Sequence, residues 1–235
     1  SAYMLQNYGA MVLRIPTTKK ATAKNGAYIV KYIIQLRGVG YVDTEKSYSD
    51  SSEVSLALGS FNSTGSGTIS IYAVDSRGNT SGVVSKTFTV LSYFVPGFSS
   101  FNLNRLNDYE AEVVLDFKGA ISKLTVAGTE KNTTRNIGYR YAELGTSYPS
   151  NFTTIGGVSV SSDSSKFILS FPQNTQDNTF GISGTGSSKL ILSNNKAYNF
   201  QFYIQDGFTT SYYEFSIEQG IPIMFIGDHD QVSIG

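Results

Sequence analysis

The sequence predicts an all-β protein of two tandem antiparallel β-sandwiches followed by a C-terminal β-hairpin. First, only 15% of its 235 residues are charged, while Gly (23), Tyr (16) and Phe (15) are abundant, which favours strands and turns over helices. Second, short stretches of alternating apolar and polar residues are separated by Gly-, Ser- and Asn-rich turns. Third, one pattern of strand, aspartate, turn and strand occurs twice, at 67–90 and 198–217.

The first half of the chain divides into strands of the length that a sandwich needs. Alternating or β-branched stretches, separated by polar turns such as Asn25-Gly26, cover 8–15, 28–38, 54–58, 69–73 and 83–90. A unit of about 90 residues with such strands is typical of an immunoglobulin-like sandwich. We therefore expect the first domain to span residues 1–93.

The second half restarts after Pro96 and Gly97, which interrupt strand pairing. Further strands are expected at 109–117, 122–128, 136–144, 165–171 and 188–193, before the closing pair at 198–217. Extra residues within 156–188 predict a larger, decorated immunoglobulin- or fibronectin III-like sandwich over residues 94–219. The remaining residues, 220–235, predict a hairpin that links into a following module.

Charge and cysteine content exclude several classes of protein. Eighteen Lys and Arg residues balance eighteen Asp and Glu residues, which disfavours binding to nucleic acid or to an anionic membrane surface. No apolar run approaches the roughly 20 residues that cross a bilayer. The absence of cysteine excludes disulfides, thiolate metal sites and a thiol nucleophile.

The repeated aspartates predict structural turns. Asp75 with Gly78, and Asp206 with Gly207, stand where a strand ends, and an aspartate there accepts backbone N–H bonds in an Asx-type turn. Another acidic stretch, with Asp228, His229 and Asp230, is a weak candidate for a metal site. Two acids do not supply the six to eight oxygens that calcium takes, so a solvated turn with no metal or cofactor is expected.

Catalysis is not expected. One histidine and no Gly-x-Ser-x-Gly elbow leave a serine triad without support. Glu110, Glu112 and Asp116 alternate with apolar residues, as on the solvent face of a strand, rather than forming a glycosidase pair. The sequence therefore predicts no catalytic residue.

Tyrosines are the best candidates for ligand contacts. Tyr139, Tyr141 and Tyr148 gather in one stretch, and Tyr212 and Tyr213 follow in the closing strand. A tyrosine offers an apolar ring with a polar tip, which suits saccharides, although alternate tyrosines of a strand also serve as core residues. Tyr139, Tyr141 and Tyr148 are the predicted saccharide contacts.

Three stretches carry a resemblance to a known family: "ATAKNGAYIVKY", "AVDSRGNTS" and the terminal "GIPIMFIGDHDQVSIG". Together they resemble minor structural and tail fibre (adhesion) proteins of siphophages that infect streptococci and lactococci. In that family, tandem immunoglobulin-like units carry a distal receptor-facing region. The resemblance implies a virion protein of the phage tail, made in the host cytoplasm, and a homo-oligomer when full length. It implies other tail proteins, and host cell-wall polysaccharide, as partners.

These observations predict a structural component of a tail fibre or baseplate adhesion device that positions a distal receptor-binding module. Two alternatives stay open at this stage. One is a carbohydrate-binding module that itself recognises host cell-wall saccharide, and the other is a bacterial surface adhesin.

Overall fold

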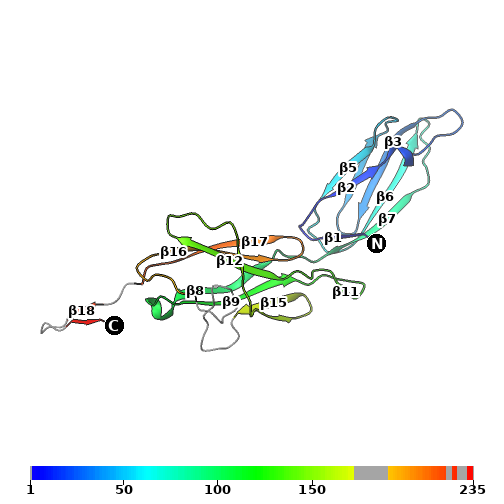
Figure 1. The fold of residues 1–235 in the computed structure, drawn as a ribbon. Helices are drawn as coiled ribbons and strands as arrows, with labels where there is room; N and C mark the ends of the chain where they lie inside the picture. Colours follow the sequence, from blue (N-terminus) through cyan, green and yellow to red (C-terminus); the bar gives the residue numbers. More distant parts are fainter. Residues whose placement is uncertain (1, 172–189, 221–223, 227–231, 235) are drawn as a thin grey trace. The chain divides into compact units, whose positions relative to one another are not determined.

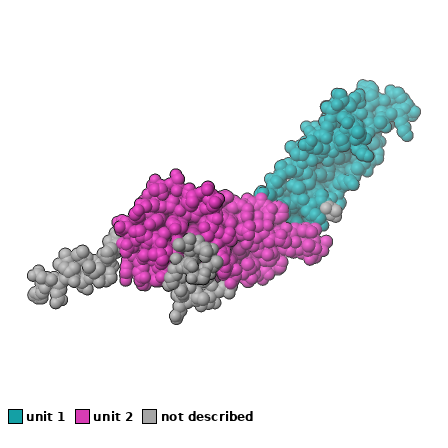
Figure 2. Space-filling view, viewed as in Figure 1, with its two compact units in different colours: residues 1–94 teal, residues 95–235 magenta. Residues whose placement is uncertain are grey.

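The chain forms two compact units, residues 1–94 (unit 1) and residues 95–235 (unit 2), in a computed structural model that describes residues 2–171, 190–220, 224–226 and 232–234 (Figures 1 and 2). Regular structure in the described residues is almost all strand. It is interrupted by two single-turn 3-10 helices, η1 (Thr17–Lys19) and η2 (Leu106–Asp108). The predicted all-β class is confirmed, and among the described residues no helix is long and apolar enough to cross a bilayer.

Unit 1 is a sandwich of a five-stranded and a two-stranded sheet (Figure 1). The larger sheet has the order β1-β7-β6-β3-β4, and the smaller one pairs β2 with β5. The strands are β1 (Ala2–Leu5), β2 (Met11–Ile15), β3 (Ile29–Arg37), β4 (Val42–Ser47), β5 (Val54–Gly59), β6 (Gly65–Asp75) and β7 (Val84–Leu91).

The core of unit 1 follows from the alternation in its strands. In β3, Tyr32, Ile34 and Leu36 are buried, and they share one core with Ile15 of β2 in the facing sheet and Phe88 of β7 in their own sheet. The side-chain period of two along a strand explains why every second residue of the sequence pattern is buried.

The first strand differs from its prediction. Residues 8–15 were expected to be one strand, but Asn7 and Gly9 have positive φ angles of 56° and 77°, so the chain turns before Met11. The short β1 that precedes this turn pairs parallel with β7, which departs from the antiparallel arrangement of the other pairs in this sheet. Neither β1 nor β4 was expected, because the four residues of β1 are too few to show alternation and β4 is mostly polar.

Unit 2 is a sandwich of two four-stranded sheets, β13-β12-β16-β17 and β14-β15-β9-β8 (Figure 1). Its aromatic core includes Phe117, Tyr139, Phe200 and Phe202, all nearly inaccessible to solvent. The strands are β8 (Gly97–Arg105), β9 (Val113–Ser122), β10 (Thr125–Val126), β11 (Thr129–Glu130), β12 (Asn136–Glu143), β13 (Thr153–Thr154), β14 (Ser159–Ser162), β15 (Lys166–Phe171), β16 (Tyr198–Gln205) and β17 (Thr210–Ile217).

Three predicted strands of unit 2 are displaced, shortened or absent. The strand expected at 122–128 is reduced to β10, because Ala127 and Gly128 have positive φ angles and turn the chain. The strand expected at 109–117 begins only at Val113, because η2 and the positive φ angles of Asn107 and Asp108 turn the chain first. In the described part of 188–193, Ile191 forms only an isolated bridge with Glu112. Most of the decoration predicted within 156–188 lies outside the described residues.

A buried arginine holds the end of β8 in unit 2. Arg105 is 3% exposed, and its guanidinium donates to four backbone carbonyls, those of Glu218 (2.8 Å), Glu110 (3.1 Å), Ser193 (3.0 Å) and Lys196 (2.8 Å). Burial lowers the pKa of Arg105 from its ordinary value. The charge is met by carbonyl dipoles, and one side chain joins three segments of the unit.

The C-terminal residues contain one more strand pair. β18 (Met224–Ile226) pairs antiparallel with β19 (Val232–Ile234), in the segment for which a linking hairpin was predicted. Asp228, His229 and Asp230, the weak metal candidates, lie outside the described residues.

Candidate functional site

The first repeated aspartate closes the turn between β6 and β7. Asp75 Oδ1 accepts hydrogen bonds from the backbone N–H groups of Arg77 and Asn79, both at 2.9 Å, and Gly78 follows with a φ of +82°. The hydrogen bond from the Asn79 side chain, supported by these two N–H groups, lowers the pKa of Asp75. Asp75 therefore acts as a partly exposed Asx-type turn residue.

The second aspartate performs the same task in the interior. Asp206 is 3% exposed, and its Oδ1 accepts from the N–H groups of Phe208 and Thr209, both at 2.8 Å. Its Oδ2 accepts from the side-chain amide of Asn132 at 3.1 Å, and Asn132 Oδ1 accepts from Gly207 N at 2.9 Å. All four positions of the predicted turns thus lie in turns. Both turns are anchored to another segment, the first by the backbone N–H of Ser76, which donates to the Tyr28 carbonyl at 2.8 Å, and the second through the buried Asn132.

Two of the predicted saccharide contacts face the core of unit 2. Tyr139 is 1% exposed, and its ring packs against Phe200, Phe202 and the half-buried Tyr141. Burial is the main cause that raises the pKa values of Tyr139 and Tyr141. A ring with no exposed face cannot stack on a sugar, so Tyr139 is a core residue.

The third, Tyr148, lies beside residues of the opposite face of the same sheet. The Arg140 guanidinium carbon lies 5.2 Å from the Tyr148 ring centre and 4.4 Å from that of Phe152. Arg140 also donates to the Pro149 carbonyl at 3.1 Å, which ties the loop after β12 to the sheet. Burial and the nearby Glu214 carboxylate raise the pKa of Tyr148.

An aromatic row runs across the outer face of this sheet. Tyr203 of β16 lies directly opposite Tyr212 of β17, with ring centres 6.4 Å apart, and Phe152 lies 5.1 Å from Tyr203 and 5.9 Å from Tyr212. Tyr203 covers Gly138 of β12, where an added Cβ would lie 2.4 Å from the Tyr203 ring. The glycine therefore lets the Tyr203 ring lie flat on the sheet, and Tyr212 remains 58% exposed.

Hydrogen-bonded polar rows flank the aromatic row on both sides. On one side Arg140 donates to Gln201 at 2.9 Å, and Gln201 donates to Glu214 at 3.1 Å. On the other side Asn136 donates to Gln205, and Gln205 to Thr210, both at 3.0 Å. We call the surface formed by these two polar rows, by the aromatic row of Phe152, Tyr203 and Tyr212 between them, and by Tyr148 the outer aromatic face.

The outer aromatic face has the chemistry of a shallow binding surface for polar ligands. Its rings offer apolar area at low cost in conformational entropy, and the flanking amide and charged groups are already oriented by one another. Strand parity in the sequence shows which residues share a face, but the partner strands decide which face is outward. Because Ile137, Tyr139 and Tyr141 share one face of β12, Gly138 and Arg140 must share the other.

The comparison with protein families gives one match. A family model described as "Siphovirus protein of unknown function (DUF859)" matches residues 14–226. The match spans both units, including the outer aromatic face. A search of curated proteins found no match.

Solved structures give low-scoring likenesses over most of the chain. A chimeric titin Z1Z2–Z1Z2 tandem is 13% identical with a TM-score of 0.24, covering 93% of this chain and 94% of that one. The FN1–FN3 domains of chicken CNTN1 are 9% identical with a TM-score of 0.30, covering 93% of this chain and 65% of that one. TM-scores this low establish neither a common arrangement of units nor a common function.

Proposed function

The chain belongs to this family of siphovirus proteins, and from that premise we propose that it is a structural component of the virion tail. In this proposal it forms part of a tail fibre or baseplate adhesion device and positions a distal receptor-binding module for attachment to the host. Its partners are other tail proteins and further copies of the same chain, and it carries out no catalytic step.

The observation that carries the proposal is the succession of two sandwiches, each with its own hydrophobic core. A unit with its own core folds without help from its neighbour, so such units can be added in series to lengthen a device. The resemblance of three sequence stretches to tail fibre proteins supports the same role.

Electron microscopy of purified virions tests this proposal. Gold-labelled antibodies raised against this chain are expected to decorate the tail, at the end distant from the capsid. Antibodies against a capsid protein serve as the control for label position. Decoration of the capsid would overturn the proposal. It would also be overturned if intact virions carry no label while the same antibodies detect the chain in infected cells by immunoblotting.

A second candidate function is saccharide binding by the outer aromatic face. The specific observation in its favour is the exposed Tyr212 in a row of rings between two pre-oriented polar rows. It replaces the predicted set of Tyr139, Tyr141 and Tyr148 by Tyr148, Phe152, Tyr203 and Tyr212. Membership of a siphovirus family gives no support to the remaining alternative, a bacterial surface adhesin.

Binding of the fluorescently tagged chain to intact streptococcal and lactococcal cells, with and without competing cell-wall polysaccharide, separates the two functions. Saccharide binding predicts saturable attachment that the polysaccharide removes and that Tyr212→Ala weakens. Tyr28→Ala is the matched control, since Tyr28 is an exposed tyrosine (69%) in unit 1. Attachment that is absent, or unchanged in Tyr212→Ala, would leave only the structural role.

A further inference from the structure

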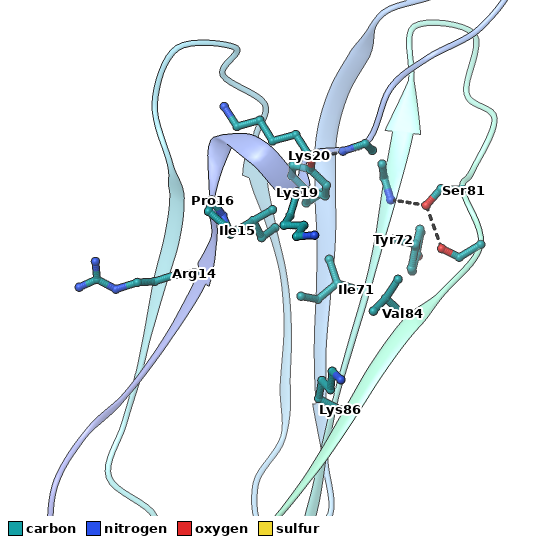
Figure 3. Close-up of a pocket in the computed structure, with 14 residues that line it drawn as sticks. Arg14, Ile15, Pro16, Lys19, Lys20, Ile71, Tyr72, Ser81, Val84 and Lys86 are labelled. Carbon is teal, nitrogen blue, oxygen red and sulfur yellow. Dashed lines mark hydrogen bonds between the residues drawn. The ribbon is translucent and has the colours of Figure 1, made fainter. Parts of the chain in front are cut away.

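A groove opens along one side of unit 1, between β2 with η1 and the first half of β7 (Figure 3). It has a cavity volume of about 720 Å³, and Ile15, Tyr32 and Ile71 contribute to its apolar lining. The groove exists because the two-stranded sheet is too narrow to cover the whole inner face of the five-stranded sheet.

The uncovered part of that face belongs to β7. Val84 lies opposite Ile71, and Lys86 lies opposite the buried Ile69, so both side chains point to the core side of the sheet. Nevertheless Val84 is 62% exposed. An apolar residue on the core side of a sandwich, open to solvent, marks a place where a covering element is missing.

Both walls of the groove are strand edges. β1 pairs with β7 from Phe88 to Leu91, and in the described part of the chain no strand pairs with the same edge at Val84–Lys86. On the other wall β2 pairs with β5 alone. Along this edge of β7, β1 therefore covers Phe88–Leu91, and the position in line with β1, beside Val84–Lys86, is vacant in the described residues. A vacant position at a sheet edge can accept an added strand.

The groove carries positive charge that the described residues of unit 1 do not neutralise. Lys19 and Lys86, on opposite walls, make no ion pair within the described residues, whereas Arg14 pairs with Glu53 at 3.1 Å and its guanidinium points away from the groove (Figure 3). The Lys20 ammonium donates to the carbonyls of Ser49 and Ser52. Unit 1 as a whole has nine Lys and Arg residues against five Asp and Glu residues.

We propose that this groove binds an extended polypeptide segment of a partner chain, in which every second residue faces the groove and these groove-facing residues are apolar and acidic in turn. The segment pairs with the edge of β7 at Val84–Lys86, in line with β1. Its apolar side chains cover Ile71 and Val84, and its carboxylates reach Lys19 and Lys86. This inference is independent of the tail assignment, because it rests on the groove alone.

Two features favour a polypeptide over a polyanion such as polyphosphate. Unpaired backbone groups of a strand edge are satisfied by another backbone, and an apolar lining stabilises only a ligand with apolar side chains.

The two lysines of the groove also affect which strands can bind. Charge at an edge discourages pairing with neutral strands, so the same residues that attract an acidic segment exclude others.

The first test uses fluorescence anisotropy to measure binding of a fluorescein-labelled heptapeptide, Val-Thr-Glu-Thr-Val-Thr-Glu, to the full chain. In an extended peptide its Val and Glu side chains share one face. We expect saturable binding, weakened by roughly tenfold for each of Lys19→Glu and Lys86→Glu. The control Lys118→Glu makes the same change of net charge in unit 2 and is expected to bind as the original chain does. The same heptapeptide with Lys in place of each Glu is expected not to bind.

The second test asks whether the bound peptide forms a strand. Hydrogen exchange at Val84–Lys86 is expected to slow in the presence of the peptide, and N-methylation of alternate peptide amides is expected to abolish binding. The proposal is overturned if both lysine reversals leave binding unchanged. It is also overturned if polyphosphate displaces the peptide and exchange at Val84–Lys86 stays fast, since the groove would then bind polyanions. Thermal unfolding of each variant checks folding, and no change is expected because both lysines are exposed.

Discussion

Asn132 and Asp206 are hydrogen-bonded to each other inside unit 2, with the Asn132 side-chain amide donating to Asp206 Oδ2 over 3.1 Å. Asn132 is 0% exposed and Asp206 is 3% exposed. The same amide group donates to the Ser122 carbonyl at 2.8 Å, so Asn132 links the end of β9 to the turn between β16 and β17. A buried carboxylate is tolerated there because every bond it accepts comes from a fixed donor.

Replacing Asn132 therefore removes partners from several buried groups at once. Asn132→Ala is expected to lower the free energy of unfolding of unit 2 by about 2–4 kcal/mol, because it leaves the buried Asp206 carboxylate without one donor. Urea unfolding followed by tyrosine fluorescence measures the change. Asn102→Ala, at an exposed and hydrogen-bonded asparagine of β8, is the control and should cost about 0.5 kcal/mol or less. Equal losses in the two variants would show that the buried link does not stabilise the unit.

Arg105 offers a test of a buried charge held by carbonyls alone. Arg105→Met is expected to destabilise unit 2 by about 3 kcal/mol, because four backbone carbonyls lose the donor that joins their segments. Arg105→Lys should recover only part of this loss, since an ammonium group cannot reproduce the planar fork of a guanidinium. The exposed Arg14, replaced by Met, is the control. Full recovery by Lys would mean that charge matters there and geometry does not.

The turn at Asp75 predicts that the stability of unit 1 depends on pH in the acidic range. Its folded-state pKa lies below the ordinary 3.8, chiefly because of the hydrogen bond from the Asn79 side chain. A lowered folded-state pKa stabilises the fold at pH values above 3.8, and this contribution is lost as the pH falls through the folded-state value. In urea unfolding, Asp75→Asn is expected to be less stable than the original chain near neutral pH and to approach it as the pH falls below 3.8. A constant difference across this range would contradict the assignment.

Gly138 tests whether the aromatic row depends on the bare backbone beneath it. Gly138→Ala places a Cβ 2.4 Å from the Tyr203 ring and 2.8 Å from the Thr153 carbonyl oxygen, so the ring or the strand must move. We expect a loss of roughly 1–3 kcal/mol in stability, measured by thermal unfolding. Gly82→Ala is the matched control, since nothing lies within 4 Å of a Cβ there. A loss as small as that of the control would show that Tyr203 does not pack on Gly138.

The strands with strong alternation were predictable, and those set by the rest of the fold were not. Residues 28–38 and 198–217 alternate over many positions, and the structure has β3, β16 and β17 there. The four-residue β1 has no such pattern, because its place depends on the free edge of β7 rather than on its own side chains. In the same way, 109–112 alternates but does not begin a strand, since the chain first turns through η2.

The candidate site was half predictable. The sequence predicted tyrosines as the ligand contacts, and the outer aromatic face does contain Tyr148. Tyr139 and Tyr141, however, pack in the core. A strand of alternating aromatic residues presents rings to one face only, and either face can be the buried one. The partner strand decides this, and Phe200, Phe202 and Ile204 of β16 bring Tyr139 to the core side.

By itself, the sequence determined the all-β class, the two Asp turns and the exclusion of cysteine chemistry, because these follow from composition and from periodicity within a few neighbouring residues. The tertiary structure alone decided the pairing of Asn132 with Asp206, the outward face of Tyr203 and Tyr212, and the groove beside β7. Each of these features joins residues far apart in the chain. Such contacts depend on strand order and register, which local patterns do not specify.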